Sequence, residues 1–291
     1  MKYFLLLIFV ALIASCNTSQ SYYKDLETGM EIRGDGLSYE QVEILVNDLP
    51  QKSTTFIFGE KVMIGFDVLE GLTRENDTTY PGVALCITTA QGDTVSINQD
   101  IVSNDTSSFS HIPLKLFTHF TAAIATAQQK DFILYINIWD KKGTGTLHFT
   151  MPFSIIENPK LKIKTKDAGY EHIYLFDAQK ECAISKQAVN KKDGVALVMD
   201  GLKGFAIENE LSYPSMSLHL EDQRGNVLLH STDVLGAFKE TGINAKELNE
   251  RLPIPITFGE GKVQNPIKLR ALLFDLKSSA QISIETEFEI R

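Results

Sequence analysis

The chain repeats part of itself. The stretch ENDTTYPGVALCITTAQGD at 75–93 returns in altered form as ENELSYPSMSLHLEDQRGN at 208–226. Other short matches keep the same order, 130 to 135 residues apart: Tyr39-Glu40 with Tyr170-Glu171, Glu70-Gly71-Leu72 with Asp200-Gly201-Leu202, Ile138-Trp139-Asp140 with Leu273-Phe274-Asp275, and 152–155 with 287–290. Small drifts in spacing are typical of loop insertions between fixed strands. The pattern predicts two copies of one domain, 37–157 and 168–291, joined by a linker at 158–167.

Each predicted copy has the sequence pattern of β structure. Runs rich in β-branched and aromatic residues, bounded by Gly, Pro, Asn or Asp, lie at 83–88, 132–139 and 147–153, and their counterparts lie at 215–220, 269–274 and 282–290. Alternation of polar and apolar side chains indicates sheets with one buried face, which must pack against each other. The expected fold is all-β, with two tandem antiparallel β-sandwiches of the immunoglobulin-like or a similar kind. Short helices are expected only at 121–128 and 244–251.

The first residues have the pattern of an export signal. Met1 and Lys2 form a short basic start, the apolar run at 4–13 is too short for a stable membrane span, and small residues precede Cys16. The segment Ile13-Ala14-Ser15-Cys16 resembles the lipobox of bacterial lipoproteins. The resemblance implies that 1–15 is removed as a signal peptide and that the sulfur of Cys16 carries a diacylglycerol. The alternative is an ordinary secretory signal with an incidental cysteine.

The residue after the cysteine bears on location. It is Asn17 and not aspartate, which in the enterobacterial sorting rule leaves a lipoprotein free to reach the outer membrane. We therefore expect a protein of the cell envelope, anchored by lipid to the outer membrane of a Gram-negative bacterium, with the exposed leaflet left open. Residues 17–36 are polar and turn-prone. With Cys16 they are expected to form a flexible tether over 16–36 with a root-mean-square span of roughly 25 Å.

The charge of the chain disfavours some classes of partner, and its cysteines bear on disulfide formation. Asp and Glu number 37 against 28 Lys and Arg, for a net charge of −9, which disfavours nucleic acid and anionic lipid as general partners. After Cys16 only Cys86 and Cys182 remain. We expect two buried, unpaired thiols, with an interdomain disulfide in an oxidising envelope as the alternative.

The repeated stretch has two interpretations. Glu-Asn, a short spacer and Tyr-Pro fit a loop that feeds a strand, since proline is tolerated at a strand start; repeated turn chemistry would then be structural. Alternatively the loops at 69–77 and 199–210 face a ligand, because loops on rigid strands carry most binding sites. The candidate ligand-binding residues in that second interpretation are Glu75, Asn76, Tyr80, Trp139, Asp140, Glu208, Asn209, Tyr213 and Asp275.

The order of these elements is similar to the calcium-dependent phospholipid-binding domain of the protein kinase C type. In that family a Gly-Leu strand leads into an aspartate-containing loop, and a later Trp-Asp-x-Asp supplies further calcium ligands. Asp140 and Asp275 match the first aspartate of that later segment, whereas Lys142 and Lys277 stand at the second. Calcium prefers six to eight oxygen ligands, so a lysine there argues against such a site. The resemblance implies a sandwich topology, and neither a metal nor a cofactor is expected.

Short catalytic motifs are missing from the chain. It contains no Gly-rich phosphate loop, His-Glu-x-x-His, Gly-x-Ser-x-Gly or Cys-x-x-Cys, and no catalytic residue is assigned. His219 and His230 flank a predicted hairpin where they could ligate a metal, but exposed positions are favoured for both. We expect a non-enzymatic lipoprotein that binds another envelope protein or a glycan. The alternatives are a glycan-active enzyme with a site that no short motif reveals, and a metal-dependent binding module.

Overall fold

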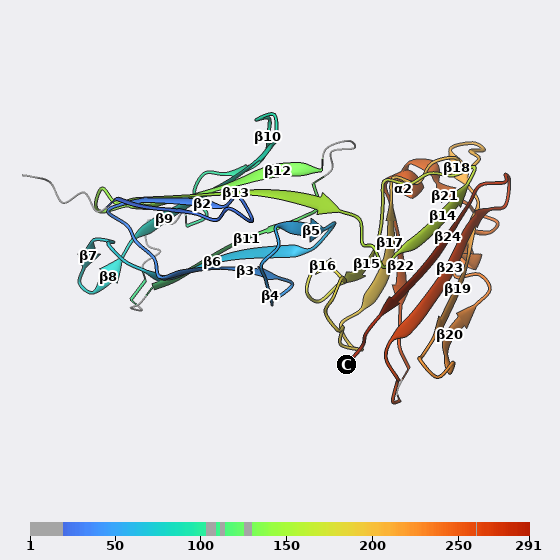
Figure 1. Cartoon of the computed structure of the whole chain (residues 1–291). Helices are drawn as coiled ribbons and strands as arrows, with labels where there is room; N and C mark the ends of the chain where they lie inside the picture. Colours follow the sequence, from blue (N-terminus) through green and yellow to red (C-terminus); the bar gives the residue numbers. More distant parts are fainter. Residues whose placement is uncertain (1–19, 103–108, 111–113, 125–129, 260) are drawn as a thin grey trace, which may run out of the picture. The chain divides into compact units, whose positions relative to one another are not determined.

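The computed structural model describes residues 20–102, 109–110, 114–124, 130–259 and 261–291. These residues form an almost entirely β protein (Figure 1), which confirms the predicted fold class. The predicted signal peptide and Cys16 lie outside the described residues. Within the described ranges, no helix is both long enough and apolar enough to cross a membrane.

The first copy of the repeat consists of two sheets. Its seven-stranded sheet has the order β1-β2-β13-β12-β9-β10, with β5 parallel to β13. The strands are β1 (Gln20–Lys24), β2 (Glu31–Asp35), β5 (Thr55–Ile57), β9 (Pro81–Thr89), β10 (Thr94–Asn98), β12 (Asp131–Asp140) and β13 (Thr146–Ile156). Its four-stranded sheet has the order β11-β6-β3-β4, from β3 (Gln41–Val46), β4 (Leu49–Gln51), β6 (Lys61–Leu69) and β11 (Leu114–Thr121). The short strands β7 (Arg74–Glu75) and β8 (Thr78–Thr79) form a separate hairpin.

The second copy also consists of two main sheets. The five-stranded sheet has the order β14-β24-β23-β19-β20, from β14 (Lys162–Lys166), β19 (Pro214–Glu221), β20 (Val227–Ser231), β23 (Ile267–Asp275) and β24 (Gln281–Phe288). The four-stranded sheet has the order β16-β15-β17-β22, from β15 (His172–Asp177), β16 (Cys182–Ala183), β17 (Val195–Asp200) and β22 (Arg251–Ile256). Smaller elements are β18 (Leu211–Ser212), β21 (Ile243–Asn244), the 3-10 helix η1 (Gly236–Phe238) and the helix α2 (Ala245–Glu250).

The strand orders confirm the duplication. β2-β13-β12-β9-β10 corresponds to β14-β24-β23-β19-β20, and β11-β6-β3-β4 corresponds to β22-β17-β15-β16. The register agrees as well, because Pro81 pairs with Asp140 in the first copy and Pro214 pairs with Asp275 in the second. Each proline is the first residue of its strand, where its missing N–H is tolerated.

Buried side chains hold the sheets together. In the first copy Phe66 and Phe149 are fully buried, and their rings meet edge to face with centroids 5.6 Å apart. The second copy has one continuous apolar core that includes Ile173, Met216 and Ile284. Burying such side chains stabilises the fold by about 1.5–3 kcal/mol each.

The chain divides into two compact units. The first comprises Met1–Glu43, Gly65–Phe117 and Asp131–Phe153, and the second comprises Ile44–Ile64, Thr118–Lys130 and Ser154–Arg291. Segments 44–64 and 118–130 thus group with the C-terminal part of the chain, although their strands pair within sheets of the first copy. The predicted bounds 37–157 and 168–291 leave out strands that pair within the main sheets. β2 lies before residue 37 and pairs with β13, and β14 lies within the predicted linker 158–167 and pairs with β24.

Two expectations about local structure need correction. The flexible tether expected over 16–36 is wrong for its described part, since β1 and β2 pair with each other and β2 pairs with β13. The helix expected at 121–128 is not formed at 121–124, and 125–129 lie outside the described residues. The helix expected at 244–251 is confirmed as α2, whose N-cap Asn244 accepts hydrogen bonds from the N–H groups of Lys246 and Glu247.

Both cysteines among the described residues are free, as expected. Cys182 is buried, whereas Cys86 is half-buried and not fully buried. Burial, followed by the nearby carboxylate of Asp177, raises the pKa of the Cys182 thiol to about 11. Because the thiolate is the nucleophile and the metal ligand, Cys182 is poorly suited to either role at neutral pH.

Candidate functional site

The predicted loop residues of the first copy meet around one carboxylate. Asp140 is 4% exposed, and its Oδ2 accepts a hydrogen bond from the N–H of Thr73 at 2.7 Å while its Oδ1 accepts from the N–H of Lys142 at 3.0 Å. The ammonium of Lys142 lies 5.2 Å from the centre of the Tyr80 ring and 3.3 Å from Glu75 Oε2. The carboxylate of Asp140 thus connects the loop at 69–77 to the end of β12. Lys142 contacts both the Tyr80 ring and Glu75 of that loop.

The second copy builds the same arrangement. Asp275 accepts from the N–H of Ala206 at 2.6 Å and from the N–H of Lys277 at 3.1 Å. The ammonium of Lys277 lies 5.1 Å from the ring centre of Tyr213 and 3.3 Å from Glu208 Oε2. A lysine over an aromatic ring is stabilised by the negative face of the ring. The lysine that stands at a calcium-ligand position in the resemblance is therefore a structural part of each loop.

The Glu-Asn pairs mark matching turns. Asn76 and Asn209 both have φ of 52°, and the residues after them, Asp77 and Glu210, have φ of 60° and 66°. Two successive positive φ angles are typical of a type I′ turn, and asparagine tolerates this left-handed region better than most residues. Eight of the nine candidate ligand-binding residues thus fall into two equivalent loop clusters, and Trp139 lies outside them. Their role in binding a ligand stays a prediction.

Calcium is expected to leave the stability of the protein unchanged. A ligand that binds only the folded state must raise its melting temperature, and each loop cluster contains an ammonium group where a cage would need oxygen. Among the described residues, no group of three or more His, Cys, Asp or Glu side chains could hold a metal ion. Differential scanning calorimetry with excess calcium and with a chelator should give the same melting temperature. A rise with calcium would contradict this expectation.

Acid is expected to weaken the first loop cluster. Burial acts to raise the pKa of Asp140, but hydrogen bonds from Thr73 and from backbone N–H groups outweigh it and leave the pKa below its usual 3.8. A carboxyl whose pKa is lowered by folding stabilises the protein above the unfolded pKa, and that stabilisation is lost as pH falls through the folded pKa. We expect the melting temperature to fall as pH drops below about 4. The fall should be shallower in an Asp140→Asn variant, and an unchanged slope would contradict the assignment.

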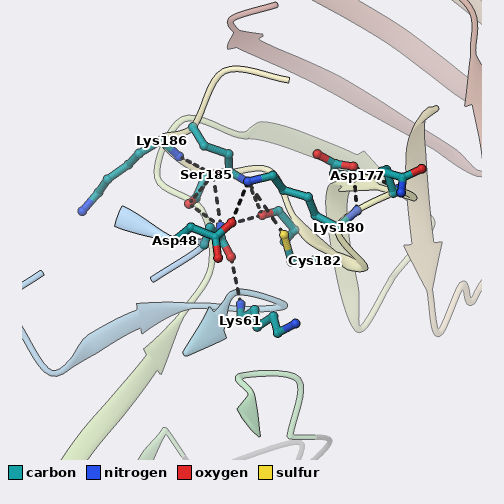
Figure 2. Close-up of polar contacts among 11 residues, drawn as sticks. Asp48, Lys61, Asp177, Lys180, Cys182, Ser185 and Lys186 are labelled. Atoms are coloured by element: carbon teal, nitrogen blue, oxygen red, sulfur yellow. Dashed lines mark hydrogen bonds and ion pairs between the residues drawn. The ribbon is translucent and has the colours of Figure 1, made fainter. Parts of the chain in front are cut away.

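A buried polar cluster lies within the second compact unit (Figure 2). The side-chain amide of Asn47, 4% exposed, donates to Ala183 O at 3.0 Å and to Gln187 Oε1 at 3.1 Å, and its Oδ1 accepts from the N–H of Lys61 at 2.9 Å. Gln187 also accepts from the N–H of Ser185 at 3.1 Å. The polar groups of this cluster form hydrogen bonds with one another away from solvent. The cluster therefore has a structural role and is not an open ligand site.

The solvent side of the seven-stranded sheet is different in character. We call it the outer face, and define it by Gln20, Tyr22, Arg33, Asp35, Tyr135, Asn137, Trp139, Thr146 and His148. Arg33 pairs with Tyr22 on one side and with His148 on the other, so the three side chains form a row. The imidazole Nδ1 of His148 lies 2.7 Å from Asn137 Oδ1, which continues the row onto β12. Arg33, Asn137 and His148 are all exposed.

A hollow opens on one side of the outer face. Its volume is about 750 Å³, and its lining includes Tyr22, Arg33, Asp35, Thr146 and His148. The guanidinium of Arg33 lies 5.3 Å from the centre of the Tyr22 ring. The volume lies within the range of small-molecule sites, and the lining combines donors, acceptors and an aromatic ring.

Trp139 is seated on the outer face beside this row. It pairs with Gly82 across the sheet, and a Cβ at position 82 would lie 2.0 Å from Trp139 Cε2. The indole therefore lies directly over the backbone of Gly82, a position that any side chain at 82 would obstruct. Trp139 is half-buried. The glycine thus sets the tryptophan ring against the sheet.

The same sheet of the second copy carries different groups. Register places Ser215 where Gly82 stands, Phe274 where Trp139 stands, Leu272 where Asn137 stands and Ser283 where His148 stands. A hollow of about 530 Å³ there is lined mainly by opposite charges, among them Lys162, Lys268, Arg270, Glu285 and Glu287. His219 and His230 approach each other on this sheet at 3.3 Å between ring nitrogens.

Sequence reasoning missed most of the outer face. Trp139 was among the predicted residues, but Tyr22, Arg33, Asn137 and His148 were not. One signal was present in the sequence: the copies differ in chemistry at solvent-side positions such as Asn137 against Leu272. A duplicated fold has to repeat its turns and its core. It does not have to repeat particular polar side chains on an exposed face.

Comparison with known proteins identifies no family. No family model matches the chain, and no curated protein matches it. Among solved structures, fibronectin(III)-like modules of Clostridium thermocellum CbhA align with 10% identity over 85% of this chain and 94% of that one, at a TM-score of 0.21. A Salmonella alpha-2-macroglobulin mutant aligns with 9% identity over 87% of this chain, which spans 15% of the length of that protein, at a TM-score of 0.25. Scores this low carry no weight, and the fold stands on the sheets described above.

Proposed function

We propose that this chain is a non-enzymatic binding or assembly module of the bacterial cell envelope. In this proposal a lipid on Cys16 anchors the chain at the outer membrane, and the outer face of the first copy contacts another envelope protein or a glycan. The observation that carries the proposal is the pair of exposed side chains Asn137 and His148, which the second copy lacks, next to Arg33 and a hollow. The net negative charge of the chain disfavours nucleic acid as a partner, because both would be anionic.

The duplication supports a division of labour between the copies. Both copies keep the loop cluster around Asp140 or Asp275, because the fold requires it. Only the first copy combines Trp139 on a glycine seat with Asn137 and His148. We assign contact with the partner to the first copy and a supporting role to the second.

The lipid anchor is tested by fractionation. The full chain, expressed in a Gram-negative host, is expected to incorporate labelled fatty acid and to sediment with outer membranes. A Cys16→Ser variant should lose the label and leave the membrane fraction. Unlabelled wild-type chain in the soluble fraction would contradict the anchor without bearing on the binding face.

Partner contact at the outer face is tested by photo-crosslinking in intact cells. A photoreactive amino acid placed at His148 is expected to form a defined adduct. The matched control places the same group at Ser283, the counterpart of His148 in the second copy. Equal crosslinking from the two positions, or none from position 148, would contradict the assignment of the partner to this face.

A further inference from the structure

We propose that the outer face binds a neutral oligosaccharide. This inference rests on the proposed function, because it names the partner of the same face. Three features support it: the ring of Trp139 over Gly82, the polar row that runs from Tyr22 to Asn137, and the charges of the hollow. Each of these features suits a sugar better than a peptide.

Trp139 supplies a fixed platform. Its indole is set by Gly82, since a side chain at position 82 would obstruct it, so the ring gains its orientation before any ligand arrives. Aromatic rings carry a negative face, and the C–H bonds on one side of a pyranose ring are weakly positive. A sugar ring can therefore stack on such a platform without first ordering it. Preorganisation of this kind lowers the cost of binding.

The polar row supplies hydrogen bonds of both signs. An amide oxygen only accepts, so His148 donates from Nδ1 to Asn137 Oδ1 across 2.7 Å. The second ring nitrogen of His148, Nε2, then accepts, whereas the amide NH2 of Asn137 donates. A sugar hydroxyl both donates and accepts. Neighbouring hydroxyls of one sugar can thus be satisfied by this fixed pair of side chains.

The charges of the hollow favour an uncharged ligand. Its lining contains one guanidinium, that of Arg33, and one carboxylate, that of Asp35. Arg33 is also held by Tyr22 at 5.3 Å and by Glu31, whose Oε2 lies 3.4 Å from its NH2 group. Asp35 would repel a strongly anionic ligand, and Arg33 would repel a strongly cationic one. A neutral chain of hexoses meets a donor and an acceptor.

A peptide fits these features less well. Extended peptides bind by adding a strand to a sheet edge, with side chains in alternate pockets. Asn137, Trp139 and His148 lie on the face of inner strands and not along a free edge. A face of planar polar groups around an aromatic ring offers hydrogen bonds to the hydroxyl groups of a sugar.

The experiment uses the fluorescence of Trp139, the only tryptophan in the chain. The mature chain is titrated with neutral gluco-, manno-, xylo- and chito-oligosaccharides, and the emission of Trp139 is followed. At least one series is expected to shift the emission in a saturable manner. Asn137→Ala and His148→Ala are each expected to weaken binding by about tenfold, which corresponds to about 1.4 kcal/mol. Both sites are exposed, so the melting temperature should stay unchanged.

Two controls separate binding from damage to the fold. Ser283→Ala alters the counterpart of His148 on the second copy and is expected to leave the affinity unchanged. Gly82→Ala is expected to displace the indole and to abolish the fluorescence response. If no series shifts the emission at millimolar concentration, or if the shift survives Asn137→Ala and His148→Ala, the inference is overturned. A protein adduct from position 148 without any sugar response would overturn it while leaving the proposed function intact.

Discussion

Replacing Asn47 with alanine is expected to lower the free energy of unfolding by about 3 kcal/mol. The substitution removes an amide that donates to Ala183 O and Gln187 Oε1 and accepts from the N–H of Lys61. The N–H of Lys61 would lose its acceptor, whereas Ala183 O keeps the side-chain amide of Gln187 and Gln187 Oε1 keeps the N–H of Ser185. Asn47 also has a φ of 49°, a region that alanine disfavours. The loss would be measured by urea denaturation as a shift of the transition midpoint.

Two further variants divide that loss into its parts. Asn47→Gly removes the same hydrogen bonds but accepts the positive φ, so it should be less damaging than Asn47→Ala by about 1 kcal/mol. Asn98→Ala changes an exposed asparagine on β10 and should leave stability within about 0.5 kcal/mol. A loss below about 1 kcal/mol for Asn47→Ala would mean that water replaces the amide.

The second large loss of stability is expected at the two equivalent carboxylates, Asp140 and Asp275. Asp140→Ala and Asp275→Ala should each lower the free energy of unfolding by about 2–4 kcal/mol. Each carboxylate is nearly buried, at 4% and 5% exposure, and each accepts from two backbone N–H groups. Because the geometry is repeated, the two losses should be similar. Calorimetry of the melting transition would measure both.

Asparagine at the same positions provides the matched control. Asp140→Asn and Asp275→Asn keep one side-chain oxygen as acceptor and should retain part of the lost stability. A large loss of stability in one copy and none in the other would show that the two loops, although alike in geometry, contribute differently to the free energy of unfolding. Such a result would contradict the structural interpretation of the repeated stretch.

The strands were predictable because their two faces differ. β12 alternates between buried and less buried residues along its whole length, and that alternation is visible in the sequence between 132 and 139. Pro81 and Pro214 marked strand starts for the same reason that they are tolerated there. The duplication was predictable because its turns and strand starts accept few residue types. Asn76 and Asn209 recur in turns with positive φ, and Pro81 and Pro214 recur at the first positions of strands.

β1 was missed because it has no buried face. Every residue of Gln20–Lys24 is exposed, so the segment shows no alternation and resembles a tether. It is held by backbone pairing with β2, which leaves no mark on composition. Strands at the edge of a sheet are in general harder to predict from periodicity than inner ones.

The buried cluster and the outer face were missed for a different reason. Asn47 and Gln187 are 140 residues apart, and no short motif joins them. Alternation shows that Arg33 and His148 face solvent, but only the register of β2 against β13 shows that they are neighbours. Such sites depend on which strands pair, and a single sequence does not state that.

The position of β1 also limits how far the protein can reach. Only Asn17, Thr18 and Ser19 separate Cys16 from the sheet, and three residues extend to about 10 Å at most. With the proposed lipid on Cys16, every molecule of the protein would present its outer face at the same height above the membrane. Several anchored molecules could then each bind weakly to successive units of one long polymer, and their binding would add up because linked sites raise the effective concentration. The short tether would thus favour avidity over the affinity of a single site.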